Sequence, residues 1–252
     1  MSETTLTLNG RPLPLNLGKV IKRSKNFNLY SPFKGCYLLQ YNSGIVLGHA
    51  IFRFQEHYES RKFRNTVFSR KNFKTWWRKN HKSPRFNYPT YYCGYNIRSE
   101  VFLPFFSGQF NPLHPLEKEI LEALSYIPET DYYVIAYNKG DHMTLSHEAC
   151  HALYALNDNY RAQVLKVLNQ YKPQLRYLYS CLKSIGYAPH VYRDEVNAFL
   201  ATDGVLGLVW AHKNYDTTQH LRIKDLELAS KLQNLLHKYA PRIEKKTPQA
   251  KL

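Results

Sequence analysis

The sequence predicts an α+β fold, with a small β-sheet from the first half packed on a mainly helical second half. Short runs rich in Tyr, Leu and Val, at 36–41 and 132–137, are typical of strands. From residue 116 onward, apolar residues recur every three or four positions, which indicates helices. No repeat or linker divides the 252 residues. We therefore expect one domain, with a strand-containing part (1–115), a helical part (116–240) and a basic tail (241–252).

The first elements follow from turn residues and apolar spacing. Residues 1–34 are polar and proline-containing, so we expect an extended lead-in. Residues 36–47 predict a β-hairpin that turns at Asn42-Ser43-Gly44. Residues 50–58 place apolar side chains on one side of a helix. Residues 101–106 form a short apolar run that predicts a strand.

Residues 60–99 combine eleven Lys or Arg and ten aromatic residues with no Asp or Glu. Within this stretch, Ser69 is expected to cap a helix that runs to Asn80. One interpretation is a nucleic-acid surface, with cations on phosphates and rings stacked on bases. The other, which we favour, is that the rings are core and the cations are solvated around them.

In the second half, a strand leads through a short turn into the helix that carries the most informative motif. The strand is 132–137, the turn is Asn138-Lys139-Gly140, and the helix is 144–156, capped by Thr144 or Ser146. The other helices are expected at 116–127, 158–171, 173–185, 192–202 (ending at Gly204) and 225–239, with an apolar segment at 204–210.

His147, Glu148 and His151 form the pattern His-Glu-x-x-His within this helix. A separation of four residues places the two imidazoles on one face, where both can bind one zinc ion. Glu148 can then act as general base toward a water at the metal. Cys150 lies off this face and is expected to be a small buried residue.

A catalytic zinc usually has three protein ligands, so a third must come from farther along the chain. The best candidate is Glu195, on a predicted helix with the small Ala198 one turn later. Here residues 132–203 resemble the gluzincin group of zinc metallopeptidases, in which His-Glu-x-x-His is followed by a Glu on a later helix. The resemblance implies a zincin-like fold in which the strand before the motif helix forms the edge of the cleft.

Several alternatives at this site stay open. The metzincin continuation fails, because Tyr154 and Asn157 occupy its required positions. His190 is an alternative third ligand. Asp194 and Asp203 are candidates for orienting a ligand His. For stabilising an oxyanion, as a Tyr or His does in the resembling group, the candidates are Tyr192 and His190.

Composition limits location and partners. The net charge is +16, from 35 Lys and Arg against 19 Asp and Glu, which favours acidic partners. The four cysteines lack disulfide or zinc-ribbon spacing, no signal-like segment begins the chain, and no apolar stretch reaches the ~18 residues of a membrane span. We expect a cytoplasmic protein, or one delivered into a host cell without a classical signal peptide.

The sequence thus predicts a zinc-dependent metallopeptidase with a protein or peptide substrate, either acidic or itself bound to nucleic acid. In this prediction His147, His151 and Glu195 hold Zn²⁺ and Glu148 is the general base. The alternative is a basic nucleic-acid-binding protein that uses residues 60–99, with a structural or inactive zincin-like fold.

Overall fold

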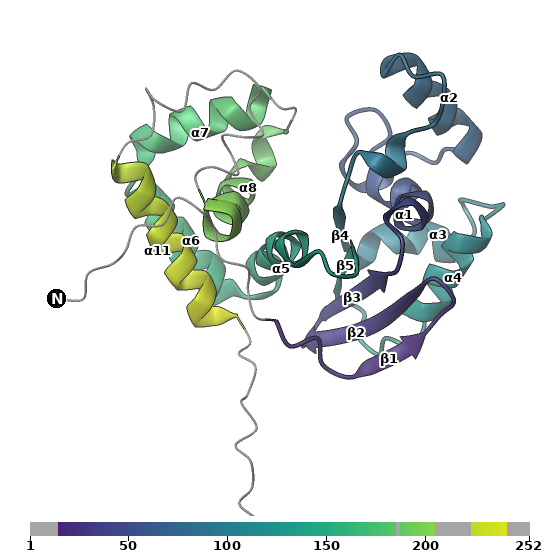
Figure 1. Ribbon diagram of the computed structural model, residues 1–252, viewed down its shortest axis with the longest axis horizontal. Helices are drawn as coiled ribbons and strands as arrows, with labels where there is room; N and C mark the ends of the chain where they lie inside the picture. The colour runs from purple at the N-terminus through teal and green to yellow at the C-terminus, as the bar shows by residue number, and fades with distance from the viewer. Residues whose placement is uncertain (1–14, 185–186, 205–222, 241–252) are drawn as a thin grey trace, which may run out of the picture.

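The computed structural model describes residues 15–184, 187–204 and 223–240 and has an α+β fold (Figure 1). The strands are β1 (Val20–Arg23), β2 (Phe27–Phe33), β3 (Cys36–Tyr41), β4 (Gly94–Arg98) and β5 (Tyr133–Asn138). Within the described residues the helices are α1 (Gly44–Glu59), α2 (Arg70–Asn80), α3 (Leu103–Phe106), α4 (Pro115–Leu124), α5 (His142–Leu156), α6 (Asp158–Asn169), α7 (Lys172–Ser184), α8 (Tyr192–Ala198) and α11 (Ile223–Tyr239). Short helical turns are η1 (Tyr88–Thr90), η2 (Ser99–Phe102), η3 (Pro189–Val191) and η4 (Phe199–Asp203).

The five strands form one mixed sheet in the order β1-β2-β3-β5-β4. Strands β1, β2 and β3 form an antiparallel meander, β3 pairs with β5 in parallel, and β4 pairs with β5 antiparallel. Strand β5 is therefore an inner strand, and the sheet edge next to the motif helix is β4. The expectation that residues 132–137 form the cleft edge is wrong, because β4 covers that side of β5.

The sheet separates two hydrophobic cores, and the central strands contribute to both. In β3, Cys36 and Leu38 face the core shared with α5, α6, α7, α8 and α11, whereas Tyr37 and Leu39 face the core shared with α1 to α4. Every residue of β3 is buried, as expected for a parallel inner strand with helices on both faces. Figure 1 accordingly places α5 between the sheet and the other C-terminal helices.

Three of the predicted elements of the first half are wrong. The lead-in contains two strands, because β1 and β2 add to the sheet at residues 20–33. The second half of the hairpin is the start of α1: the Ser43 side chain accepts a hydrogen bond from the amide of Val46 and begins a helix instead of a turn. Residues 101–106 lie in η2 and α3, and the strand of this region comes earlier, at β4.

The other predicted elements are confirmed within a few residues, as far as the structure describes them. Ser69 caps α2, since its hydroxyl accepts from the amide of Asn72. The predicted helices at 50–58, 116–127, 144–156, 158–171, 173–185, 192–202 and 225–239 correspond to α1, α4, α5, α6, α7, α8 with η4, and α11. The predicted segment 205–210, the end of the 173–185 helix and the tail 241–252 lie outside the described residues. No helix among the described residues is long and apolar enough to cross a bilayer.

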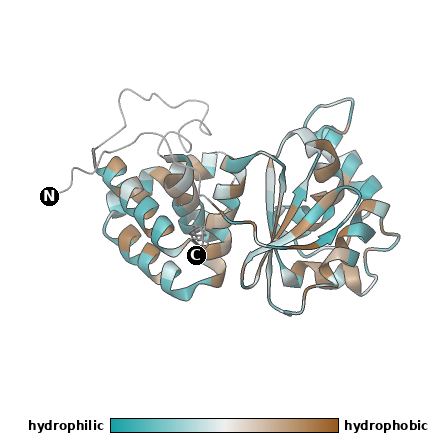
Figure 2. Cartoon of the chain, turned by 60° about the horizontal axis from the view of Figure 1, so that its bottom comes forward, coloured by the Kyte–Doolittle hydropathy of each residue, from teal (hydrophilic) through white to brown (hydrophobic). Residues whose placement is uncertain are grey.

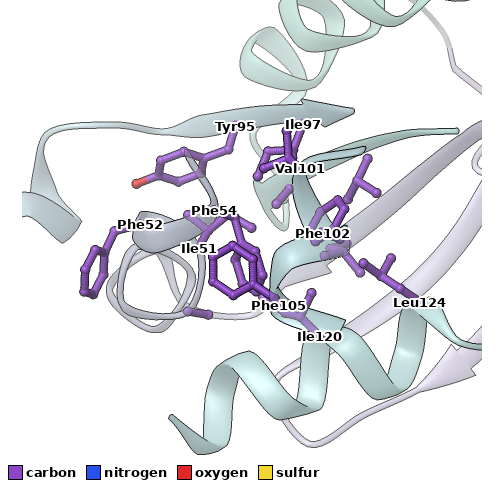
Figure 3. Close-up of a cluster of buried hydrophobic side chains, with 14 of the residues drawn as sticks. Ile51, Phe52, Phe54, Tyr95, Ile97, Val101, Phe102, Phe105, Ile120 and Leu124 are labelled. Atoms are coloured by element: carbon purple, nitrogen blue, oxygen red, sulfur yellow. The ribbon is translucent and has the colours of Figure 1, made fainter. Parts of the chain in front are cut away.

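Most rings of the stretch 60–99 belong to the core, which agrees with the interpretation that we favoured. Phe63, Phe68, Phe73, Trp77, Tyr88 and Tyr95 are buried. They join a larger aromatic cluster beneath α1, part of which is drawn in Figure 3 around Phe54, Phe102 and Phe105. The helices in Figure 2 are accordingly striped, with hydrophobic residues alternating with hydrophilic ones. These buried rings are not available to stack on bases.

A buried ion network fixes α2 and α4 against α1. Glu117, in the first turn of α4, is fully buried and accepts hydrogen bonds from Arg53 of α1 and Arg70 of α2. It also accepts from the backbone amide of His114, which completes the capping box of α4. Burial raises the pKa of the Glu117 carboxyl, but the hydrogen bonds and charges of Arg53 and Arg70 lower it overall.

Replacing Glu117 by Gln is expected to lower the free energy of unfolding by about 3–5 kcal/mol, because the buried guanidinium of Arg53 and the partly buried one of Arg70 lose their shared partner. A carboxyl whose pKa is lowered by folding stabilises fully above its unfolded pKa and loses this contribution as the pH falls through its folded pKa. The free energy of unfolding of the wild-type protein should therefore decrease as the pH falls below 4.5, the ordinary pKa of Glu. The variant should lack this pH-dependent decrease.

The measurement is urea unfolding at a series of pH values. Glu122→Gln is the matched control, because Glu122 lies on the same helix with its side chain 65% exposed and, among the described residues, forms an ion pair only with Lys22. Its expected effect is about 0–1 kcal/mol. If both variants lost the same free energy of unfolding, the buried ion network would not be a main contact between these helices.

Candidate metal centre

Helix α5 presents the two histidines of the motif on one face. It begins at Asp141, whose carboxylate accepts hydrogen bonds from the backbone amide (3.0 Å) and the hydroxyl (2.7 Å) of Thr144. The predicted caps Thr144 and Ser146 are therefore wrong, since the helix starts one turn earlier. His147 and His151 lie one turn apart, with Nε2 atoms 3.3 Å from each other. Cys150 points away into the core, where it contacts Tyr160 and Asn197.

Helix α8 and the π-helical turn η4 bring three carboxylates against these histidines. Oε2 of Glu195 lies 3.8 Å from Nε2 of His151. Asp194 Oδ1 lies 3.0 Å from Nδ1 of His151, and Asp203 Oδ2 lies 3.0 Å from Nδ1 of His147. Each imidazole therefore has one nitrogen on an aspartate and the other turned toward its neighbour and Glu195.

The three inward-facing atoms have the spacing that a metal ion requires. The ligand atoms of His147, His151 and Glu195 all lie within 4.8 Å of one another. Two nitrogens bound to a tetrahedral zinc at about 2.0–2.1 Å would be about 3.3 Å apart, which agrees with the separation of the two Nε2 atoms. Glu195 Oε2 is buried and has no hydrogen-bond partner among the described residues. These residues fit a two-His, one-Glu metal site.

Burial and neighbouring charges act in opposite directions on these groups. Burial lowers the pKa of His151, but the carboxylates of Asp194 and Glu195 raise it well above its ordinary value. Burial also lowers the pKa of His147, and Asp203 outweighs this and raises it. The pKa of Glu195 is raised, since burial outweighs the two histidines. The carboxylates therefore supply the negative charge that a dication would neutralise.

Glu148 lies beside this cluster and is held from the edge strand. Its Oε2 accepts a hydrogen bond of 2.6 Å from the side-chain amide of Asn96 on β4. The Asn96 carbonyl in turn accepts a hydrogen bond of 2.7 Å from the Tyr133 hydroxyl on β5. The second oxygen of Glu148 has no such partner among the hydrogen bonds of the described residues. One oxygen of Glu148 is thus held by Asn96.

The cluster opens into a cleft of about 530 Å³. Its walls come from the C-terminal half of α1, from α2, from β4, and from the segment 187–195. His190 and Tyr187 line this cleft, and His190 Nε2 lies 3.3 Å from an Arg64 nitrogen, away from the three-residue cluster. Tyr192 does not line it; its ring packs on Tyr179.

Two residues of the site were not predicted from the sequence. Asn96 is absent from any motif, and only the pairing of β4 with β5 brings it to Glu148. Tyr187 is one of 21 tyrosines and precedes His190 and Tyr192, the two residues that the sequence suggests for stabilising an oxyanion. Burial, followed by the charges of Glu195 and Glu148, raises its pKa well above the ordinary value, so its phenol stays a hydrogen-bond donor.

Gly94 lets the edge strand approach α5 closely enough for these contacts. A Cβ atom at this position would lie 2.2 Å from Thr144 Cγ2 and 2.9 Å from Glu148 Oε1. Gly94→Ala is expected to cost about 1–3 kcal/mol of stability and to displace Glu148, since overpacking forces neighbours to move.

The checks are urea unfolding and, for the activity proposed below, the rate of peptide hydrolysis. Gly44→Ala is the matched control, because a Cβ at Gly44 meets nothing within 4 Å. We expect it to be neutral or to stabilise by up to about 1 kcal/mol. If Gly94→Ala were as harmless as Gly44→Ala, the close approach of β4 would be unimportant.

No protein-family model, no curated protein and no solved structure matches this chain.

Proposed function

We propose that this protein is a zinc-dependent peptidase that cleaves peptide bonds of a protein substrate. One observation carries the proposal: two imidazole nitrogens 3.3 Å apart and the unpartnered oxygen of Glu195 converge in a cleft, with Glu148 beside them. A set of two His and one Glu is typical of catalytic zinc, which keeps a further position open. The strand β5, the helix α5 and the antiparallel edge strand β4 support a zincin-like arrangement.

Zinc, when bound, would lower the pKa of a water ligand and polarise the scissile carbonyl. The residues of the chain divide the remaining work. Glu148 would accept the proton of the attacking water and deliver it to the leaving amine. Asn96 would keep the Glu148 carboxylate in place, and Asp194 and Asp203 would fix the orientation and tautomer of His151 and His147.

For the oxyanion, the cleft supports Tyr187 better than the sequence candidates. Tyr187 lines the cleft and keeps its hydroxyl proton, so it can donate to a developing negative charge. His190 also lines the cleft and is the second candidate. Tyr192 packs against Tyr179 and is the least suitable of the three.

The exposed edge of β4 offers a way to bind an extended peptide. Its partner on one side is β5, and its other side is the free edge of the sheet at the cleft. A peptide added along β4 would form backbone hydrogen bonds and pass Glu148 at Asn96. The wall formed by α1 carries Glu56 and Glu59. Burial raises the pKa of both carboxyls, that of Glu59 to about 8, so this wall favours neutral side chains or a cation that restores their charge. The acidic substrate expected from the net charge would have to bind elsewhere on the surface.

The proposal is tested by metal content and proteolysis of an unfolded protein mixture. Protein purified without chelators is expected to contain about one zinc per chain. It should generate new peptide termini, detected by mass spectrometry, that disappear on chelation and return with zinc. Protein that neither carries nor takes up zinc would overturn the proposal, as would cleavage that persists unchanged in the metal-free form.

A further inference from the structure

A second concave site lies on α2, on the opposite face from the metal cleft. We call it the α2 groove; it has a volume of about 360 Å³ and is lined by Arg70, Lys71, Lys74, Thr75, Arg78 and Phe86. Figure 1 shows α2 at the outer end of the sheet-containing half. Trp76 and Trp77 lie on the other face of the same helix and line the metal cleft. The two sites are therefore separated by the width of one helix, about 10 Å.

The groove gathers four cations, of which only Arg70 has an acidic partner among the described residues. None of its lining residues is acidic, and residues 60–99 contain no Asp or Glu. Among the ion pairs of the described residues, none involves Lys71, Lys74 or Arg78. The carboxylate that pairs with Arg70, that of Glu117, is buried and already shared by two arginines.

These cations crowd one another. Burial lowers the pKa of Lys74, and the positive charges of Arg70 and Arg78 lower it further. The pKa of His49, which stacks near Phe86, is lowered by burial and then by Lys74 and Arg70. An anion bound in the groove would relieve this mutual repulsion, so the positive potential of the groove favours anion binding.

The spacing of the cations indicates which kind of anion. Lys74 and Arg78 are four residues apart, which corresponds to about 6 Å along the helix axis. This interval is comparable with that between successive phosphates of an extended nucleic-acid strand. Arg70, one turn earlier, is held by Glu117 and by the backbone carbonyl of His49. Phe86, half-buried beneath Lys74, adds an aromatic surface to the groove, as is common in single-strand binding sites.

We propose that the α2 groove binds the sugar–phosphate backbone of a single-stranded nucleic acid. Contacts would be to phosphates, because most rings of residues 60–99 are buried and cannot take part in base stacking. Binding should accordingly be salt-dependent and indifferent to sequence. The inference does not depend on the peptidase proposal, since it concerns another face of α2 and requires no metal.

The test is fluorescence anisotropy of a labelled single-stranded 12-mer with the full chain, at a series of salt concentrations. Each phosphate contact contributes about −0.7 to the slope of log K against log salt. The triple variant Lys71→Gln, Lys74→Gln, Arg78→Gln should reduce the slope by about 2 and weaken binding about tenfold at low salt. Thermal unfolding should be little changed, since Lys71 and Arg78 are exposed and Lys74 is half-exposed.

The matched control removes the same charge elsewhere. Lys172, Arg176 and Lys183 are exposed on α7, in the other half of the molecule. Their triple replacement by Gln should leave the slope unchanged. Three results would overturn the proposal: no binding by the wild-type chain at low salt, equal losses in the two triple variants, or tighter binding of a poly-glutamate peptide or of anionic lipid vesicles than of the oligonucleotide.

Discussion

Replacing Glu148 by Gln is expected to leave about one zinc per chain in place and to slow peptide hydrolysis by about 10²- to 10⁴-fold. The amide keeps the size of the side chain but cannot accept the proton of the attacking water. Glu148 is not one of the three metal-facing residues, so metal content should be retained. The measurements are elemental analysis and initial rates with a peptide that the wild-type protein cleaves.

One control makes this result interpretable. Glu122→Gln on α4 makes the same chemical change far from the cleft and should alter neither zinc content nor rate. A Glu148→Gln protein that cleaves at the wild-type rate would exclude Glu148 as general base, whereas one that loses its zinc would assign it a structural role.

Glu195→Ala is expected to remove zinc from the protein, whereas Asp194→Asn should keep it with reduced affinity. Glu195 is the carboxylate whose oxygen faces both Nε2 atoms within 4.8 Å, so its loss leaves two ligands. Asp194 lies on the outward side of His151, with its Oδ1 3.0 Å from Nδ1. Loss of such an orienting partner typically weakens metal affinity by about 10- to 100-fold.

Zinc affinity measured by competition with a chelating indicator separates the two cases. At saturating zinc, Asp194→Asn should return to about one zinc per chain and regain part of the hydrolysis rate. Glu195→Ala should bind more weakly than Asp194→Asn and stay without activity. The opposite order, with Asp194→Asn the more severe, would identify Asp194 as the ligand and Glu195 as its neighbour.

Local signals predicted the helices well and the sheet poorly. Ser69 caps α2 through its own hydroxyl, so a short-range pattern was sufficient there. Gly44 is typical of a turn, yet Ser43 before it caps a helix. Because Ser and Gly are common both in turns and at helix starts, the local sequence does not distinguish the two. Strands β1 and β4 lie at the two edges of the sheet and have only four and five residues, so the alternation in their sequences is too short to be distinctive.

The candidate site divides in the same way. His147, Glu148 and His151 are visible in sequence because one helical turn joins them. Glu195 was predicted by resemblance, and the structure brings it to within 3.8 Å of His151. Asn96 reaches Glu148 only through the pairing of β4 with β5, which no local pattern encodes. Side-chain contacts that depend on the order of the strands cannot be predicted from sequence until the pairing of the strands is known.

The sharing of β3 and β5 by both cores has a consequence for how the protein unfolds. Since alternate residues of these strands belong to opposite cores, neither core can open without exposing one face of the other. Unfolding should therefore be a single cooperative transition. A ligand that binds only the folded state at α5 and α8 should then slow amide hydrogen exchange in α1 and α4 as well, although these helices lie across the sheet from it.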